Sequence, residues 1–217
     1  MININELAMV VILLSVLLSL ASNRLVALVK IMAVQGLMVS LLPLLMEHHG
    51  RMGSGGLIFF QVMILIKGGL IPALLYVALK RVMSKREIEP IVGYHASLFA
   101  GLIIILVSIF ITERLQLSLP KGHGLLLTTA ITTMAAGLFL MMSRRKAITQ
   151  VIGYLMLENG IYLTGTALTK HSHTMYIVEF GVLLDLLVAV MVMGIILLNI
   201  NQLFDDIDTD LLNRLRH

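Results

Sequence analysis

Stretches of about twenty consecutive apolar residues, separated by short polar segments, constrain this chain more than any other feature of its sequence. A helix of about 20 apolar residues is long enough to cross the ~30 Å hydrocarbon core of a bilayer. The sequence therefore predicts an all-α, polytopic membrane protein with about seven transmembrane helices. The expected spans lie at roughly 4–21, 25–46, 57–79, 91–112, 123–142, 147–168 and 175–199.

The overall composition excludes several other classes of protein. Of the 217 residues, 59% are hydrophobic and only 13% are charged, whereas a soluble domain has about 45–50% apolar and about 25% charged residues. A nucleic-acid-binding domain is excluded on this ground, although the isoelectric point is about 9.5. Because the chain has no cysteine, it cannot hold disulfides, thiolate zinc sites or cysteine-ligated iron–sulfur clusters.

The basic residues are divided unevenly between the two sets of polar segments. One side holds eleven of them: Arg24, Lys30, Lys80, Arg81, Lys85, Arg86, Arg144, Arg145, Lys146, Arg214 and Arg216. The other side holds four: Arg51, Arg114, Lys121 and Lys170. The positive-inside rule places the first side in the cytoplasm, with the N-terminus outside and the C-terminus inside. The acidic segment at 201–217 would then be a cytoplasmic tail, either a solvated end or a cap for a partner's basic surface.

Three ionisable side chains interrupt the apolar spans near their middle. Lys67, Glu158 and Asp185 each lie roughly 15–17 Å along the helix from one end of their span, and Gln35 lies at a similar depth. A charge there costs at least about 2.5–3.5 kcal/mol, so these groups are expected to face protein or water, most simply one another. Carboxylates and a lysine removed from water can exchange protons near neutral pH. They indicate either a proton path or a static ion pair that locks two helices together.

Two further residues belong to the same hypothesis. Glu179 lies only four residues into the seventh span, so it is either the entrance of the path or an interfacial anchor. Pro72 follows Lys67 by five residues and removes a backbone hydrogen bond next to Gly68 and Gly69. The sequence therefore predicts a kink or local opening of the third span beside the lysine.

A weak internal repeat relates the two halves of the chain. Gln35 and Lys67 lie in the second and third spans, and Glu158 and Asp185 lie in the sixth and seventh. This order is typical of a 3+1+3 pseudo-repeat in which the fourth span connects two groups of three helices.

The histidines raise the question of haem ligation. Five of the seven lie on the predicted outer side, at 48, 49, 123, 171 and 173, and of these all but His123 fall in polar segments. Solvated loop histidines are the favoured interpretation. No cofactor, metal site or catalytic centre of the chain's own is therefore expected.

The segments around the buried charges resemble the membrane subunit family called hydrogenase-4 component E. The resemblance is carried by residues 67–72 (KGGLIP), 152–160 (IGYLMLENG) and 185–193 (DLLVAVMVM), in this order along the chain. Residues 122–200 are also similar to small three-helix subunits of respiratory complex I and of cation antiporters, the NuoK and MrpC types. In the NuoK type the membrane glutamate follows an Ile-Gly pair by two positions, whereas Glu158 follows Gly153 by five.

The resemblance implies a four-helix part at 1–121, a NuoK-like part at 122–200 and a tail at 201–217. It further implies a non-catalytic membrane-arm subunit of a group 4 nickel–iron hydrogenase or a complex I-like oxidoreductase in the inner membrane. Antiporter-like and other membrane subunits would be its partners, together with the lipid bilayer. Lys67, Glu158 and Asp185 would contribute to proton or sodium translocation, and the alternative is a scaffold whose midplane charges only fasten helices.

Overall fold

The computed structural model describes residues 4–46, 61–81, 91–115, 123–168, 188–189 and 191–194. These residues form helices joined by short segments, with no β-strand among them, so the predicted all-α class is confirmed. The elements are α1 (Ile4–Ala21), α2 (Leu25–Met46), the π-helical turn η1 (Ile66–Leu70), α4 (Ile71–Arg81), α5 (Tyr94–Arg114), α6 (His123–Ser143) and α7 (Ala147–Leu168). Residues 61–65 are also helical and run directly into η1.

Five helical segments of the described residues are long and apolar enough to cross a membrane. They are Ile4–Ala21, Leu25–Pro43, Gln61–Lys80, Tyr94–Arg114 and His123–Ser143. The predicted sixth span, α7, has 22 residues but is not one of the five, because Gln150, Glu158 and Asn159 make it more polar. Of the predicted seventh span, only residues 188–189 and 191–194 are described, and they are helical. The chain is a multi-pass membrane protein.

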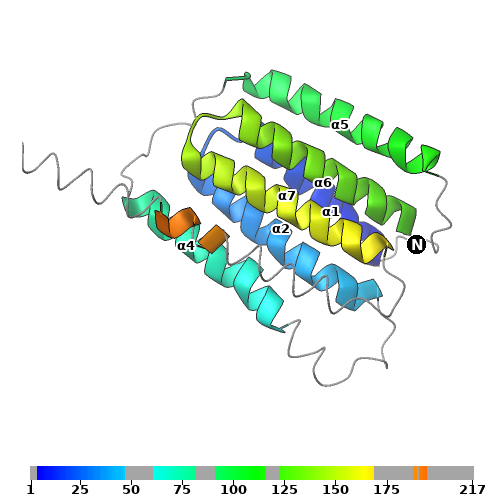
Figure 1. Ribbon diagram of the computed structural model, residues 1–217, viewed down its shortest axis with the longest axis horizontal. Helices are drawn as coiled ribbons and strands as arrows, with labels where there is room; N and C mark the ends of the chain where they lie inside the picture. Colours follow the sequence, from blue (N-terminus) through cyan, green and yellow to red (C-terminus); the bar gives the residue numbers. More distant parts are fainter. Residues whose placement is uncertain are drawn as a thin grey trace, which may run out of the picture.

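Four of the described helices form the centre of the bundle. α1 contacts α2 and α6, and α7 contacts the same two helices, so that α1, α2, α7 and α6 enclose a common core. Figure 1 shows α5 on one side of this group and α4 on the opposite side. The predicted boundary between 121 and 122 and the predicted tail at 201–217 lie outside the described residues, and the division into two parts stays a prediction.

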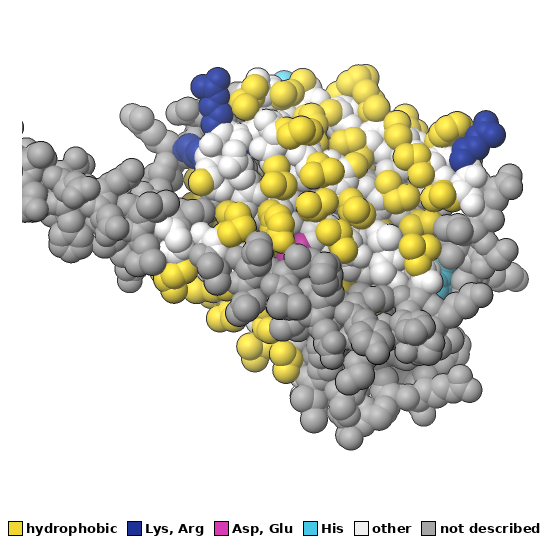
Figure 2. Space-filling model, in the orientation of Figure 1, with side chains coloured by type: hydrophobic (Ala, Val, Ile, Leu, Met, Phe, Trp, Pro, Cys, Tyr) yellow, Lys and Arg dark blue, Asp and Glu magenta, His cyan; other side chains and the backbone are white. Residues whose placement is uncertain are grey.

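The outer surface of the bundle is apolar. Figure 2 shows hydrophobic side chains over the visible face, with lysine and arginine side chains only near the ends of the helices. The large apolar side chains of α5 point outward, with Phe99 65% exposed and Leu106 66% exposed. A surface of this kind is suited to contact with lipid chains rather than with water.

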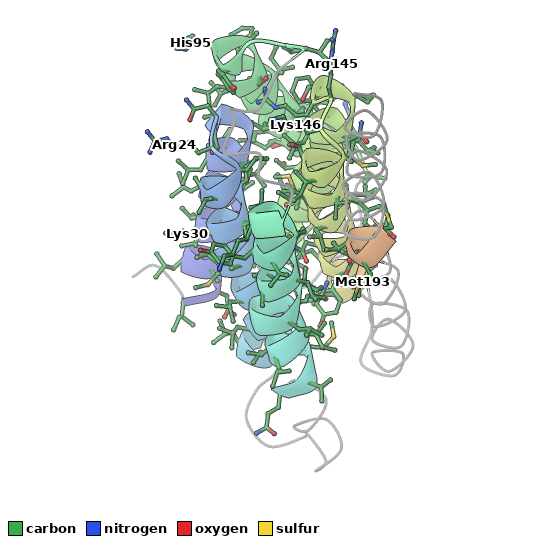
Figure 3. The ribbon with its side chains drawn as sticks, turned by 90° about the vertical axis from the view of Figure 1, so that its left-hand side faces the viewer. Arg24, Lys30, His95, Arg145, Lys146 and Met193 are labelled. Atoms are coloured by element: carbon green, nitrogen blue, oxygen red, sulfur yellow. The ribbon has the colours of Figure 1, made fainter. Side chains whose placement is uncertain are left out.

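One end of the bundle gathers basic side chains and is called the basic end below. Figure 3 shows Arg24, His95, Arg145 and Lys146 there. α1 and α6 finish at this end, and α2, α5 and α7 begin there. The sequence alone assigned Arg24, Arg145 and Lys146 to a single side of the membrane, and the structure places them at a single end of the molecule.

Arg144 has a different role from the exposed arginine that follows it. Its side chain is 1% exposed, and it donates hydrogen bonds to the Leu20 carbonyl at 3.0 Å and the Val92 carbonyl at 3.5 Å. Its guanidinium also lies 4.9 Å from the centre of the Tyr94 ring. Burial lowers the pKa of Arg144, and Tyr94 opposes this change, but an arginine remains charged at neutral pH. Arg144 therefore fastens the end of α1 to the segment that precedes α5.

The same contacts explain why α5 begins three residues later than the predicted span at 91–112. Residues 91–93 are not helical, because the Ile91 N–H donates to the Ser143 carbonyl at 2.9 Å and the Val92 carbonyl accepts from Arg144. These backbone groups are satisfied across the basic end instead of within a helical turn. Hydropathy alone carries no information about such bonds.

Replacing Arg144 by methionine is expected to lower the free energy of unfolding by about 1–3 kcal/mol, because the buried Leu20 carbonyl loses its arginine donor and the partly buried Val92 carbonyl keeps the Ser97 hydroxyl as a donor at 3.4 Å but loses the guanidinium. The neighbouring Arg145 is exposed, so Arg145→Met is the matched control and should change stability by about 0.5 kcal/mol or less. Titration of the purified chain with dodecyl sulfate, followed by circular dichroism, measures both. Equal effects of the two substitutions would contradict the role assigned to Arg144.

Candidate functional site

A layer of polar side chains divides the interior of the bundle into two apolar clusters. The cluster nearer the basic end, cluster 1, includes Val16, Leu20, Leu28, Met32, Ile71, Leu75, Leu140, Ile152 and Met156. The other, cluster 2, includes Met9, Ile12, Val39, Leu42, Met63, Leu126, Tyr162 and Leu163. Between them lie Gln35 of α2, Lys67 of η1, and Glu158 and Asn159 of α7, which are here called the polar layer.

Each of the three helices crosses from one cluster to the other at its polar residue. On α2, Gln35 lies between Met32 of cluster 1 and Val39 of cluster 2. The helix through η1 runs the opposite way, and Lys67 lies between Met63 of cluster 2 and Ile71 of cluster 1. On α7 the crossing falls between Met156 and Tyr162. The polar layer is thus enclosed by apolar side chains both toward the basic end and toward the far end.

Lys67 and Glu158 form a buried ion pair at the centre of this layer. The Lys67 ammonium donates to Glu158 Oε1, and the two side chains are 3% and 1% exposed. The same ammonium donates to Asn159 Oδ1 at 3.3 Å and lies 5.8 Å from the centre of the Tyr162 ring. Among the described residues, the Glu158 carboxylate therefore balances the lysine charge, and an amide oxygen and an aromatic face lie beside the ammonium.

Close packing of α6 against α7 sets the direction in which Glu158 points. A Cβ atom on Gly137 of α6 would lie 2.7 Å from the Gly153 carbonyl oxygen, and one on Gly160 of α7 would lie 2.9 Å from the Ala130 carbonyl oxygen. These glycines let the two backbones meet, as small residues do between membrane helices. Glu158 lies about 140–160° around the helix from Gly153 and Gly160. The glycine contacts therefore turn the glutamate away from α6.

The helix that carries Lys67 is held closely against α2. A Cβ atom on Gly36 would lie 2.8 Å from the Lys67 carbonyl oxygen and 3.4 Å from the Lys67 Cβ. Lys67 lies in the π-helical turn η1, in which the Ile71 N–H donates to the Ile66 carbonyl five residues earlier. Pro72 follows at the second position of α4. Single π-helical turns inside α-helices are frequent at functional sites, and the predicted effect of Pro72 on the helix axis stays a prediction.

The structure places the other predicted residues as follows. Gln35 is fully buried in the polar layer, whereas Asp185 and Glu179 lie outside the described residues, as do His48, His49, His171 and His173. His123 begins α6, and its Nδ1 lies 3.2 Å from the Ala167 carbonyl oxygen near the end of α7. In the part of the chain that the structure describes, no group of three histidine, cysteine or acidic side chains could hold a metal ion.

Three residues of the observed arrangement were not predicted from the sequence: Gly36, Tyr162 and Arg144. Two of these residues could have been predicted from their positions in the sequence. Tyr162 follows Glu158 by four residues and therefore shares its helix face, and Gly36 is adjacent to Gln35. The burial of Arg144 could not have been predicted, because two consecutive arginines between helices, here Arg144 and Arg145, are equally typical of a solvated loop.

Comparison with known proteins finds relatives at two levels of identity. The chain is 32% identical over 192 residues to the uncharacterized protein Rv0085 of Mycobacterium tuberculosis. The aligned residues cover 88% of this chain and 86% of that protein. It is 24% identical over 147 residues to hydrogenase-4 component E of Escherichia coli K12, covering 68% and 67% of the two chains. The same values hold for hydrogenase-4 component E of Shigella flexneri. No family model matches the chain, and no solved structure matches it.

Proposed function

We propose that this chain, which belongs to the same family as the uncharacterized protein Rv0085 of Mycobacterium tuberculosis, is a non-catalytic membrane subunit of a hydrogenase-like or complex I-like oxidoreductase. In this complex it contributes buried charges to the movement of protons, or of sodium ions, across the inner membrane. The distant similarity to hydrogenase-4 component E supports membership of such a complex. The buried charges of the polar layer support a role for this chain in moving ions.

The observation that carries the proposal is the buried pair of Lys67 and Glu158. Two ionised side chains in the interior of a membrane protein are costly, and such residues commonly mark ion pathways. A carboxylate can bind a proton and a lysine can release one, so the pair can be neutral or ionic without any change in its total charge. A proton that reaches Glu158 weakens its attraction to Lys67, and the departure of that proton restores the attraction.

The proposal extends to residues outside the described part of the chain. Asp185 and Glu179 would continue the path from Lys67 and Glu158, and Gln35 would take part through its amide. Antiporter-like subunits would be the neighbours that pass ions to or from this path. The basic end would face the cytoplasm, with the N-terminus outside and the C-terminus inside.

The alternative function is a scaffold in which the pair only holds helices together. It is favoured by the near-complete burial of both side chains, since mutual pairing offsets much of the cost of placing each charge in the membrane. The two functions differ in what happens when the pair is replaced by neutral side chains of similar shape, because a scaffold needs the packing and a proton path needs the titrating groups.

The test is the double substitution Lys67→Met and Glu158→Gln in the assembled complex. Among the described residues, the two changes remove both charges of the polar layer together, so the complex is expected to assemble. Donor-driven proton movement in sealed membrane vesicles, followed with a pH-sensitive dye, is expected to be lost, and sodium flux is measured in the same vesicles. The redox rate of solubilised complex and a native gel report whether the complex is intact.

Two results would overturn the proposed function in favour of the scaffold. One is an assembled double variant that moves ions at the wild-type ratio to electrons. The other is a single-residue variant that loses the complex from the native gel while whatever assembles still pumps normally. The control is Glu113→Gln, which neutralises an exposed glutamate at the end of α5 and should leave pumping unchanged.

A further inference from the structure

Gln35 is a buried polar side chain that makes no side-chain hydrogen bond to any other described residue. It is fully buried at 0% exposure, and within the described residues neither its amide nitrogen nor its amide oxygen has a hydrogen-bond partner. Leaving a buried donor or acceptor unsatisfied costs about 1–3 kcal/mol. Native proteins rarely accept this cost, and an ordered water molecule is a common way of avoiding it.

The position of Gln35 brings its amide to the level of the ion pair. α2 and α7 both begin at the basic end and contact each other. Gln35 lies ten residues into α2 and Glu158 eleven residues into α7, about 15–17 Å along each helix. The next residue of α2, Gly36, lies directly against Lys67. Gln35 is therefore a neighbour of the pair without hydrogen bonding to it.

We propose that Gln35 binds ordered water inside the polar layer and that this water joins its amide to the group formed by Glu158 and Asn159. A buried water needs about two to four polar partners. The Gln35 amide supplies two N–H donors and a carbonyl acceptor, and the Glu158 carboxylate supplies further acceptor positions. Clusters 1 and 2 lie on either side of the layer, so the water is held between two apolar regions rather than in contact with either membrane surface.

This water site has consequences for the proposed function without depending on it. Water beside the carboxylate gives a proton on Glu158 a neighbour to which it can pass, and that consequence rests on the proposed function. The site itself rests on the burial of Gln35. The two can therefore fail separately, because a bound water does not require pumping and pumping does not require a water at Gln35.

Three buried methionines make the site accessible to experiment. Met32, Met63 and Met156 each lie within one helical turn of a residue of the polar layer, and they are 4%, 0% and 0% exposed. Hydroxyl radicals produced by X-ray pulses from bound water oxidise nearby methionine even where bulk water is excluded. The experiment irradiates the full chain in lipid nanodiscs equilibrated with ¹⁸O water and maps the oxidised methionines by mass spectrometry.

In the wild-type chain we expect oxidation at one or more of these methionines, and loss of that oxidation in Gln35→Leu. Ser40→Ala is the matched control, because Ser40 is buried on the same helix but donates to the Gly36 carbonyl at 2.8 Å and needs no water. Unoxidised methionines in the wild type would overturn the inference, and this result requires no variant to fold. Oxidation in Gln35→Leu equal to the wild type would overturn the assignment of the water to Gln35.

Discussion

Replacing Glu158 alone by glutamine is expected to lower the free energy of unfolding by about 3–5 kcal/mol. The substitution removes the Glu158 carboxylate from the Lys67 ammonium. Because the lysine side chain is only 3% exposed, water cannot replace that carboxylate. The Asn159 oxygen and the Tyr162 ring remain, but neither carries the negative charge that balances the lysine. A loss of this size is a large part of the total stability of a typical domain, about 5–15 kcal/mol.

The double variant Lys67→Met and Glu158→Gln separates the cost of an unpaired charge from the value of the pair. It should recover most of the stability that Glu158→Gln loses, because replacing both members of a buried pair is often close to neutral. Dodecyl sulfate titration of the purified chains measures all the variants. If Glu158→Gln is no more destabilising than the exposed control Glu113→Gln, Lys67 does not need this carboxylate and the pair is not a stabilising element.

The depth of the buried charges and their facing one another were predictable from the sequence, but which carboxylate pairs with Lys67 was not. Counting residues from the ends of the spans placed Lys67 and Glu158 near the same plane, because every helical residue advances by about 1.5 Å. The count says nothing about rotation around the helix axis. The contacts of Gly137, Gly153 and Gly160 set that rotation, and they involve backbone atoms of a second helix.

Hydropathy predicted the order of the described helices, and the predicted spans 4–21, 25–46 and 147–168 coincide with α1, α2 and α7. It was least informative at the start of α5 and about the surroundings of α7. The start of α5 depends on bonds that Ile91 and Val92 make with residues 143 and 144, more than fifty positions away in the chain. α7 is too polar to meet the hydropathy criterion that the other spans meet, and its most polar side chains near mid-helix, Glu158 and Asn159, lie against protein instead of lipid. In both cases tertiary contacts decide the outcome, and a local average of the sequence does not contain them.

Introducing leucine at Gly137 is expected to separate α6 from α7. An overpacked core typically loses about 1–3 kcal/mol in the free energy of unfolding, and this substitution should cost more than that. A Cβ atom at this position would lie 2.7 Å from the Gly153 carbonyl oxygen and 2.9 Å from the Leu157 Cα. Both obstructing atoms belong to the backbone, so no rotamer change can make room. Gly124 lies on the same helix with no atom within 4 Å of such a Cβ, and Gly124→Leu should cost little.

The same substitution tests whether the glycine contacts and the ion pair act together. If the close approach of α6 and α7 is what directs Glu158 toward Lys67, then moving α7 weakens the pair as well as the packing. Gly137→Leu should then destabilise the wild-type chain more than it destabilises the Lys67→Met and Glu158→Gln variant, in which there is no pair to lose. Equal losses in the two backgrounds, measured by dodecyl sulfate titration, would show that Glu158 is directed by its contacts with α2 and η1 alone.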